Sequence, residues 1–268
     1  MDRRNFLKTG GIALLGSLAT GSAMALTTPG ALGGEGADKK AAVALAMNHF
    51  GVSEADLKKV LAAALEKGGD YADLFFEHTI SNSIRLMDGA VNNSYSNIDY
   101  GVGVRVLIGD QSGYAYVENI TVEDMLKAAR TAARIASANK GNKPLNLTEK
   151  ELKKNYYTVA SPWEEVSLKD KMPYLQKLND RIFALDKRVH KVQASQSDTT
   201  SHIFFCNSEG VMFYDYRPMV TLGAVCIMEE DGKTENGYAA RAYRRGFDFL
   251  SDEVVDVIAR EAVDQTSL

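Results

Sequence analysis

The sequence predicts an α+β fold in which helices pack on an antiparallel or mixed β-sheet. Apolar residues recur at helical spacing in several segments, and two long stretches between them alternate β-branched or aromatic residues with polar ones. These segments follow the order helix, antiparallel strands, helix, and the order occurs twice. We therefore expect two helix–strands–helix units, with helices covering a sheet.

The first unit is expected at residues 38–140. Asp38 is predicted to start an alanine-rich helix, and Ser53 and Thr121 are predicted to start two more, because each has an aspartate three residues later that can complete a cap. Between the second and third helices the period changes to two, with Asp-Gly and Gly-Asp turn signals. The predicted strands lie at about 71–79, 82–87, 90–97, 101–108 and 113–118.

The second unit is expected at residues 160–268, after a polar connector. A helix is predicted from Ser167 to about Leu185; an alternative start is Pro173, because proline is harmless at a first helical position but removes a hydrogen bond inside a helix. A strand-rich stretch follows from Val189 to Phe249. Its turns, and the cap of the final helix, are expected at 207–210, 230–233 and Ser251.

The N-terminal segment differs from the rest and is expected to be a targeting signal. Residues 1–25 begin with Arg3 and Arg4 in the pattern Arg-Arg-x-Phe-Leu-Lys, followed by an uncharged, glycine-containing stretch and Ala-Met-Ala. This pattern predicts a twin-arginine signal, export to the periplasm and a flexible linker at 26–37; the alternative is a cytoplasmic protein. The apolar stretch is at or below the ~20 residues that span a bilayer, so no stable membrane anchor is expected.

Charge and cysteine content limit the function further. The formal net charge is -4, and Lys and Arg are scattered, so a direct nucleic-acid partner is not expected. Cys206 and Cys226 are predicted to lie in apolar strands separated by one intervening strand, farther apart than the ~7 Å that a disulfide allows. We therefore expect two buried free thiols.

No catalytic motif is visible in the spacing of the residues. None of the histidines, His49, His78, His190 and His202, has a second ligand one helical turn away, which favours exposed or singly bonded histidines over a metal site. The neighbours Glu77 and His78 lie in a predicted strand, so they point to opposite faces. A grouping of His190, Asp198 and His202 is left open.

Phosphate-binding and nucleophile motifs are also missing. Gly101 and Gly103 have no third glycine at the dinucleotide-binding spacing and lie in a predicted strand, where glycine more often marks a close backbone approach. The sequence has no Gly-x-Ser-x-Gly elbow. From spacing alone, the chain is an α+β protein without a visible active site.

The stretch from Gly69 to Ala133 resembles the N-terminal domain of the TldD/PmbA family, whose members have been called modulators of DNA gyrase. The resemblance rests on YADLFFE (71–77), MDGAV (87–91), GVGVRV (101–106) and GDQSGYAY (109–116), in this order and spacing. The family outline continues to the end of the chain, so residues 38–268 are interpreted as this domain, with possible sub-units at 38–140 and 160–268.

The resemblance implies a zinc metallopeptidase in which a His-Glu-x-x-x-His helix, after this domain, holds the metal. The motif is absent here, so no catalytic or metal-binding residue is assigned, and zinc is expected only in a catalytic domain that this chain lacks. Whether the chain is an enzyme by itself is left open: it is a fragment, an early-terminated reading frame or a standalone module.

Within this family, the expected contribution of the domain is to handle an unfolded peptide substrate along an exposed sheet edge. The predicted residues of the peptide path are Asp88, Gly89, Gly101, Gly103, Arg105, Gly113 and Tyr114. The resemblance also implies a homo- or heterodimer with a family member. The alternative function is a non-catalytic peptide-binding or assembly module of the periplasm, in which these glycines and aromatics only form turns and core.

Overall fold

The computed structural model describes residues 39–136, 148–149 and 159–266. The helices are α2 (Lys39–Phe50), α3 (Glu54–Ala64), α4 (Val122–Ile135), α5 (Leu168–Leu185) and α6 (Asp252–Thr266), with the short 3-10 helices η2 (Trp163–Glu165) and η3 (Phe247–Phe249). The strands are β1 (Tyr71–Met87), β2 (Ala90–Ile108), β3 (Gln111–Val117), β4 (Thr148–Glu149), β5 (Val189–Asn207), β6 (Val211–Glu230) and β7 (Lys233–Tyr243).

All seven of these strands belong to one sheet. The order is β3-β2-β1-β5-β6, and both β7 and the short β4 pair with β6. Every pairing is antiparallel except that of β4 with β6. The predicted α+β class, with helices packed on an antiparallel or mixed sheet, is confirmed.

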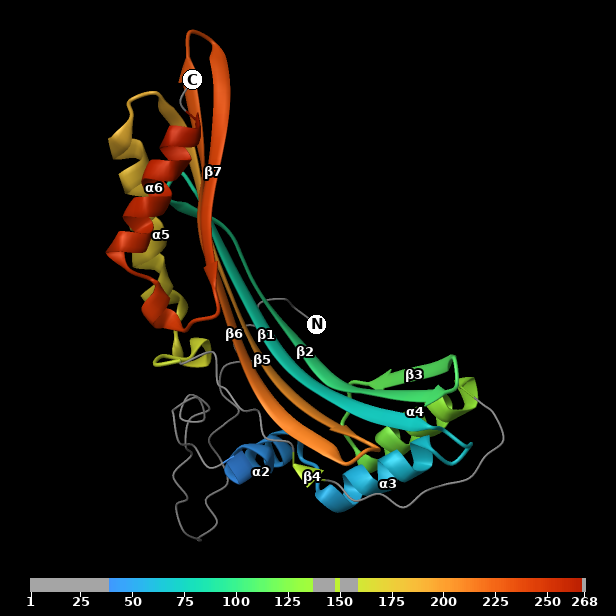
Figure 1. Ribbon diagram of the computed structural model, residues 1–268. Helices are drawn as coiled ribbons and strands as arrows, with labels where there is room; N and C mark the ends of the chain where they lie inside the picture. Colours follow the sequence, from blue (N-terminus) through green and yellow to red (C-terminus); the bar gives the residue numbers. More distant parts are fainter. Residues whose placement is uncertain (1–38, 137–147, 150–158, 267–268) are drawn as a thin grey trace, which may run out of the picture.

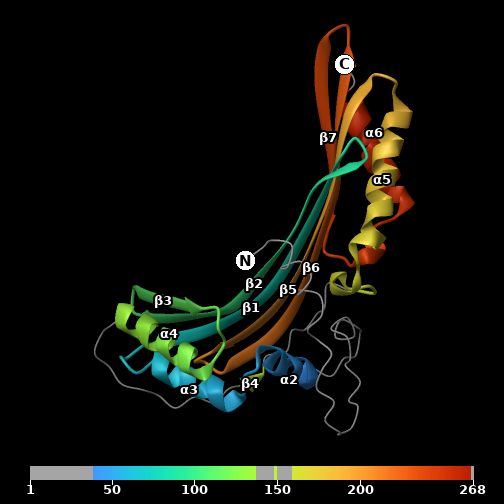
Figure 2. The same ribbon diagram turned by 180° about the vertical axis from the view of Figure 1, so that it is seen from behind.

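The sheet is long and strongly bent, and helices cover its outer side at the two ends (Figure 1). Helices α5 and α6 lie along one half of the sheet, whereas α2, α3 and α4 lie under the other half. The opposite view shows the same arrangement, and the helices of the described residues all lie on the outer side of the bend (Figure 2). Two hydrophobic cores follow from this arrangement, one at each end of the same strands.

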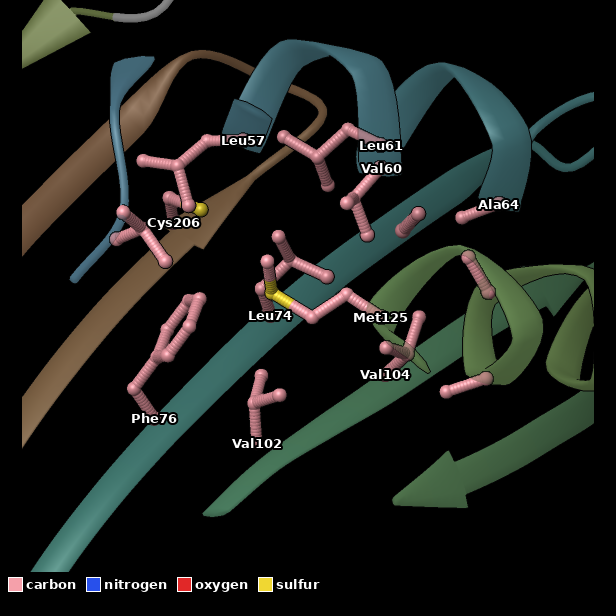
Figure 3. Packing of buried hydrophobic residues seen from close by; sticks show 14 of the residues in the cluster. Leu57, Val60, Leu61, Ala64, Leu74, Phe76, Val102, Val104, Met125 and Cys206 are labelled. Atoms are coloured by element: carbon pink, nitrogen blue, oxygen red, sulfur yellow. The ribbon is translucent and has the colours of Figure 1, made fainter. Parts of the chain in front are cut away.

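The first core lies between α2, α3 and α4 and one end of β1, β2 and β5. Figure 3 shows the side chains of α3, including Leu57 and Leu61, pointing toward Leu74 and Phe76 of β1. In α3 the buried residues recur at helical spacing, and in β1 they recur at every second position, as the sequence patterns predict. Leu57, Leu61, Leu74 and Phe76 are all fully buried.

The second core lies between α5 and α6 and the other end of the sheet. Leu175, Leu178 and Ile182 of α5 are fully buried, and so is Leu222 of β6. Between the two cores, the helix-facing side of the sheet becomes polar. There Lys171 of α5 forms a buried ion pair with Asp198 of β5, with Nζ 2.5 Å from Oδ2, and Asn82 and Gln196 also donate to Asp198.

Two predicted strand breaks are wrong. The segments 71–79 and 82–87 form the single strand β1, and 90–97 and 101–108 form the single strand β2. The breaks are expected at 80–81 and 98–100, but in the structure these residues lie in the middle of two continuous strands, where Ile80 pairs with Ile98 and Ser81 pairs with Asn97. The register of β1 and β2 shifts only once, between Arg85 and Leu86.

The predicted turns and caps mostly agree with the structure. Both Asp-Gly turns have positive φ at the aspartate and at the glycine, at Asp88–Gly89 and Asp231–Gly232, as tight hairpins require. Ser53, Thr121 and Ser251 accept hydrogen bonds from the first turns of α3, α4 and α6.

Helix α5 begins at Leu168, so the alternative start at Pro173 is wrong. Pro173 is tolerated inside the helix, close to its N-terminal end, where Ser167 and Asp170 form the capping box. The side chain of Asp170 accepts hydrogen bonds from both the backbone and the hydroxyl of Ser167. This cap offsets part of the cost of the missing proline donor.

The two cysteines are free and buried, as predicted. The reason given for their separation was wrong, because β5 and β6 are adjacent strands without a strand between them. Cys206 pairs with Met212 and Cys226 pairs with Val192, at opposite ends of the β5–β6 pair. Each thiol therefore belongs to a different core.

The predicted signal (1–25), the linker (26–37) and the cap at Asp38 lie outside the described residues. The helix that follows Asp38 is present as α2. Among residues 39–136, 148–149 and 159–266, none of the helices has the length and apolar character needed to cross a bilayer.

Replacing Gly237 by alanine should weaken the packing of α6 on β7. A Cβ atom at this position would lie 2.5 Å from the carbonyl oxygen of Ala262 and 2.5 Å from Oγ1 of Thr266. We expect the free energy of unfolding to fall by about 1–3 kcal/mol, as for other overpacked sites. Urea unfolding of the full chain measures it, with the exposed neighbour Asn236→Ala as the control; equal losses in both variants would contradict the crowding.

Replacing Lys171 by methionine should leave the carboxylate of Asp198 buried without its cation. We expect a loss of about 3–5 kcal/mol in the free energy of unfolding, and a partial recovery when Asp198→Asn is added. The matched control is Lys177→Met in the same helix, because Lys177 pairs with Asp252 on the surface and such pairs contribute at most about 1 kcal/mol. Similar urea midpoints for the two lysine variants would refute a structural role of the buried pair.

Candidate functional site: an unpaired sheet edge beside a histidine cluster

Strand β2 has a long unpaired edge. Strand β3 pairs only with Val102–Ile108 of β2, and no other described strand pairs with Ala90–Gly101 on that side. Residues 90–100 are all exposed, and Asp99 is the single charged residue of this segment. An exposed edge of this length presents a row of free backbone donors and acceptors.

The register shows which residues of this edge direct their backbone groups outward. The carbonyl oxygen of Ala72 accepts from Ser208, and the amide of Asp88 donates to Val192, so even-numbered residues of β1 bond to β5. Odd-numbered residues of β1 therefore bond to β2, since alternate residues of a strand bond to opposite sides. In the β1–β2 register Ser96 lies opposite Asn82. The outward-facing backbone groups of β2 are thus those of Ser94, Ser96, Ile98 and Tyr100.

Exposed apolar side chains accompany these backbone groups. Val91, Tyr95 and Ile98 are each more than half exposed. Tyr100, at the end of the edge, contacts the rings of Phe50 and His78. The edge therefore combines main-chain hydrogen-bonding capacity with apolar contacts on both faces, which is the requirement for adding an extended peptide.

The seven predicted peptide-path residues lie in two groups, one at each end of this edge. Asp88 and Gly89 form the turn that begins β2. A Cβ at Gly89 would meet Gln176 and Asn179 of α5, and Asp88 accepts from the amide of Val192. These two residues are therefore packed against the second half of the molecule.

The other predicted residues lie where the edge meets β3. The ring of Tyr114 lies over Gly103, and Gly113 packs against the backbone of Ala132 in α4. Arg105 donates to Asp73, with Nη2 2.6 Å from Oδ2. A Cβ at Gly101 would meet the carbonyl oxygen of Val117, the last residue of β3. Tyr114 itself is 57% exposed, so its ring is accessible beside the edge.

Three histidines that are distant in the sequence meet at the polar middle of the sheet. Together with Glu164 they form a group that we name the histidine cluster: His49, His78, His202 and Glu164. Nε2 of His49 lies 2.8 Å from Nδ1 of His78, and the ring centroids of His49 and His202 are 4.8 Å apart. His202 is buried and contacts Tyr214 through Nδ1, at 2.7 Å, and Glu164 through Nε2, at 3.0 Å.

The expectation of exposed or singly bonded histidines is wrong for His202, which has two side-chain partners. It holds for His190, which is exposed and has Glu229 3.8 Å away. The grouping of His190, Asp198 and His202 does not form, because Asp198 pairs with Lys171. Glu77 and His78 do point to opposite faces: Glu77 accepts from Thr79, whereas His78 contacts His49.

Burial and the charges of neighbouring imidazoles make His49 and His78 hard to protonate. The pKa of His49 is lowered to about 4, first by burial and then by the neighbouring His202 and His78, against the opposing charge of Glu164. Burial and His202 also lower the pKa of His78. Burial alone would raise the pKa of Glu164, but hydrogen bonds from His202 and Tyr216 and the charge of His202 bring it below its usual value.

The histidine cluster does not have the geometry of a metal site. Both ring nitrogens of His202 already have partners, Tyr214 and Glu164, and Nε2 of His49 lies 2.8 Å from Nδ1 of His78, too close for a metal ion between these two atoms. Within the part of the chain that the structure describes, no three His, Cys, Asp or Glu residues are placed to hold a metal ion. These residues do not fit a zinc ion, and no hydrolytic step can be derived from them.

Sequence relatives share less than half of their own length with this chain. A TldD metalloprotease homologue of Haemophilus influenzae is 32% identical over 206 residues, which cover 73% of this chain and 42% of the relative. A TldD homologue of Buchnera aphidicola is 26% identical over 207 residues, covering 77% of this chain and 43% of the relative. A metalloprotease of Methanocaldococcus jannaschii is 24% identical over 198 residues, covering 70% and 42%.

Solved structures share the fold. A protein of Thermotoga maritima named for modulation of DNA gyrase superposes with a TM-score of 0.62 at 20% identity, over 80% of this chain and 48% of that protein. A protein of Bacteroides thetaiotaomicron with a similar name gives 0.64 at 13% identity, over 79% and 49%. TldE of Thermococcus kodakarensis gives 0.58 at 16% identity, over 78% and 46%.

Family models assign both halves of the chain. Residues 72–136 match domain 1 of the PmbA/TldA metallopeptidases, and residues 161–268 match their central domain. The first range contains β1, β2, β3 and α4, and the second contains α5, the three strands β5 to β7 and α6. Together the two matches cover more than half of the sequence, and this chain therefore belongs to the TldD/PmbA metallopeptidase family.

Proposed function

We propose that this chain is the substrate-handling part of a TldD/PmbA-type zinc metallopeptidase and that it holds an unfolded peptide for catalytic groups supplied elsewhere. The family relatives are named as metalloproteases, and this chain covers 42% of the Haemophilus influenzae homologue. The His-Glu-x-x-x-His motif is absent from the sequence. The part of the reaction that its own residues can perform is binding and orienting the substrate.

The observation that carries this proposal is the unpaired edge of β2. An extended peptide that pairs with Ser94, Ser96, Ile98 and Tyr100 would satisfy their outward backbone groups and continue the sheet. Main-chain pairing accepts many sequences, because it uses groups that every residue except proline provides. The side chains of Tyr95 and Ile98, both exposed, would contact alternate residues of the peptide.

The positions of the predicted residues support a path along this edge. Asp88 and Gly89 mark its beginning, and Gly101, Gly103, Arg105, Gly113 and Tyr114 mark its end. An added strand would therefore run between the two groups and approach the exposed ring of Tyr114. The ion pair of Arg105 with Asp73 fixes β1 to β2 at this end, because Asp73 is buried.

The same edge also favours a second candidate function, assembly with another chain of the family. The segment Ala90–Gly101 has one charge and no proline, so it lacks the residues that usually prevent edge-to-edge pairing. A homo- or heterodimer formed through this edge would leave no room for a peptide in the same position. The two candidate functions therefore predict different occupants of the edge: a peptide substrate in the first and another chain of the family in the second.

Proline at Ser96 should weaken peptide binding at the edge without breaking the sheet. It removes one outward-facing donor and leaves the bonds to β1 intact, as is tolerated on an edge strand. We expect the affinity for a library of short unstructured peptides to fall about tenfold, ~1.4 kcal/mol. Fluorescence anisotropy measures the affinity, and Ser96→Ala, which keeps the donor, should bind like the wild type.

Hydrogen exchange with the same peptides locates the contact. Peptide binding should protect amides within residues 90–101, whereas protection confined to other segments would refute the edge as the site. If the chain is a dimer whose edge is already protected without peptide, the assembly function replaces the peptide-binding one.

The chain alone should not cleave the peptides, and adding a family member that carries the metal motif should yield cleavage or altered cleavage. Cleavage by the isolated chain, with one zinc ion bound per chain, would overturn the proposal.

We also propose that the protein is exported by the twin-arginine route, on the evidence of Arg3 and Arg4. Replacing both by lysine should keep the protein in the cytoplasm, as measured by cell fractionation and immunoblotting. The control is Lys8→Arg, which preserves the charge and should not change export. An unchanged periplasmic fraction in the double variant would contradict this route.

A further inference from the structure

Helix α2 is attached to the sheet by two kinds of contact. Its apolar side chains Val43, Ala46 and Phe50 are buried, and the ring of Phe50 lies near those of Phe76 and Phe204. Its second contact is polar, because the ring of His49 meets two other imidazoles, those of His78 and His202, whose own centroids are 5.9 Å apart. This second contact depends on protonation, whereas the first does not.

The partners of His49 come from three separate elements. His78 lies on β1, His202 lies on β5 and Glu164 lies on η2, which precedes α5 in the second half of the chain. Imidazole rings 4.8 and 5.0 Å from that of His49 leave little room for water between them. The histidine cluster thus joins α2 to the strands and to the beginning of the second half.

We propose that the histidine cluster is an acid-sensitive latch, in which protonation of His49 and His78 releases α2 from the sheet. The physical reason is that three imidazoles so close together repel one another once more than one of them carries a proton. Release would expose Phe50, which is 2% exposed in the docked state. It would also uncover Tyr100, the ring of β2 that packs against Phe50.

The groups around the cluster cannot neutralise this charge. Among the described residues, Glu164 is the carboxylate whose charge acts on His49 and His78. Its two oxygens already accept hydrogen bonds from His202, Tyr216 and Thr200. The other polar side chains near the rings are three tyrosines: Tyr100, Tyr214 and Tyr216. Burial raises the pKa of each tyrosine hydroxyl, so all three stay neutral in acid. A single carboxylate can balance one imidazolium, so it cannot balance His49 and His78 when both are protonated.

The sign of the pH dependence follows from the lowered pKa of His49. The docked helix holds this pKa at about 4, whereas a released, solvated His49 returns to its ordinary value of 6.5. Protons therefore bind the released form more tightly. Docking is fully stable above about pH 6.5 and is lost progressively as the pH falls toward 4.

The size of the effect is measurable. The full shift would raise the ratio of released to docked α2 about 70-fold between neutral pH and about pH 4.5. Because the side chain of His49 is exposed at its outer side, solvent screens part of this effect, and we expect about a tenfold rise. Helix α3 has no histidine, so its opening should not follow this pH dependence.

Hydrogen exchange of the full chain at neutral pH and at about pH 4.5, corrected for the intrinsic exchange rates, tests the latch. We expect α2 in the wild type to open about tenfold more in acid than α3 does. His49→Gln keeps a hydrogen-bonding side chain but cannot be protonated, so its α2 should lose the acid response. His190→Gln, at the exposed histidine outside the cluster, should keep it.

Two outcomes would overturn the proposal. One is an α2 of the wild-type protein that opens no more in acid than α3, whatever the variants do. The other is a His49→Gln protein that retains the full acid response. If α2 of the His49→Gln protein is already open at neutral pH, His78→Gln provides the second test. This variant should keep α2 docked and reduce the acid response of α2. An undiminished acid response in the His78→Gln protein also refutes the latch.

Discussion

Strands β1, β5 and β6 run without a break from one hydrophobic core to the other, and the remaining structure depends on this continuity. Since alternate residues of a strand point to opposite faces, a single set of positions in β1 lines both cores. Leu74 and Phe76 face the first core, and Ile84 and Leu86 face the second. A shift of register at either end would turn both apolar sets away from their helices.

The same continuity creates the polar middle of the sheet. Among the described residues, the positions between the two cores meet single polar side chains near the helix ends, His49 in the last turn of α2 and Lys171 in the first turn of α5, and not a large apolar cluster. The chain fills these positions with four polar residues whose side chains have partners on neighbouring strands, on α2, on α5 and on η2: His78, Asn82, Asp198 and His202. The candidate site and the histidine cluster both occupy this region.

Local features of the fold could be predicted from the sequence, whereas features that depend on long-range pairing could not. The Asp-Gly turns and the caps at Ser53 and Thr121 depend on residues within one turn of chain, and all of them are present. The false breaks at 80–81 and 98–100 lie between the two cores, where polar residues such as Ser81 and Asp99 interrupt the apolar pattern of the strands.

The histidine cluster is an example of long-range pairing. His49, His78 and His202 share no local spacing, and His78 lies opposite His202 only in the β1–β5 register, which the sequence pattern does not reveal. The peptide-path residues were chosen from their turns and glycines and from the family resemblance. Their arrangement around an unpaired edge depends on the length of β3, which pairs with only part of β2.

The pairing of β1 with β5 also affects how the chain can fold. Ala72 contacts Ser208 across 136 residues, so the centre of the sheet closes only after a very long loop has been brought together. Such non-local strand pairing slows folding, and during synthesis β1 must wait, with a bare edge, until β5 has left the ribosome. The two halves are therefore not separate folding units, because the first half cannot complete its sheet before most of the second half exists. A chaperone or a partner strand that covers the edge of β1 in this interval would protect the chain at the stage of synthesis when that edge is most exposed.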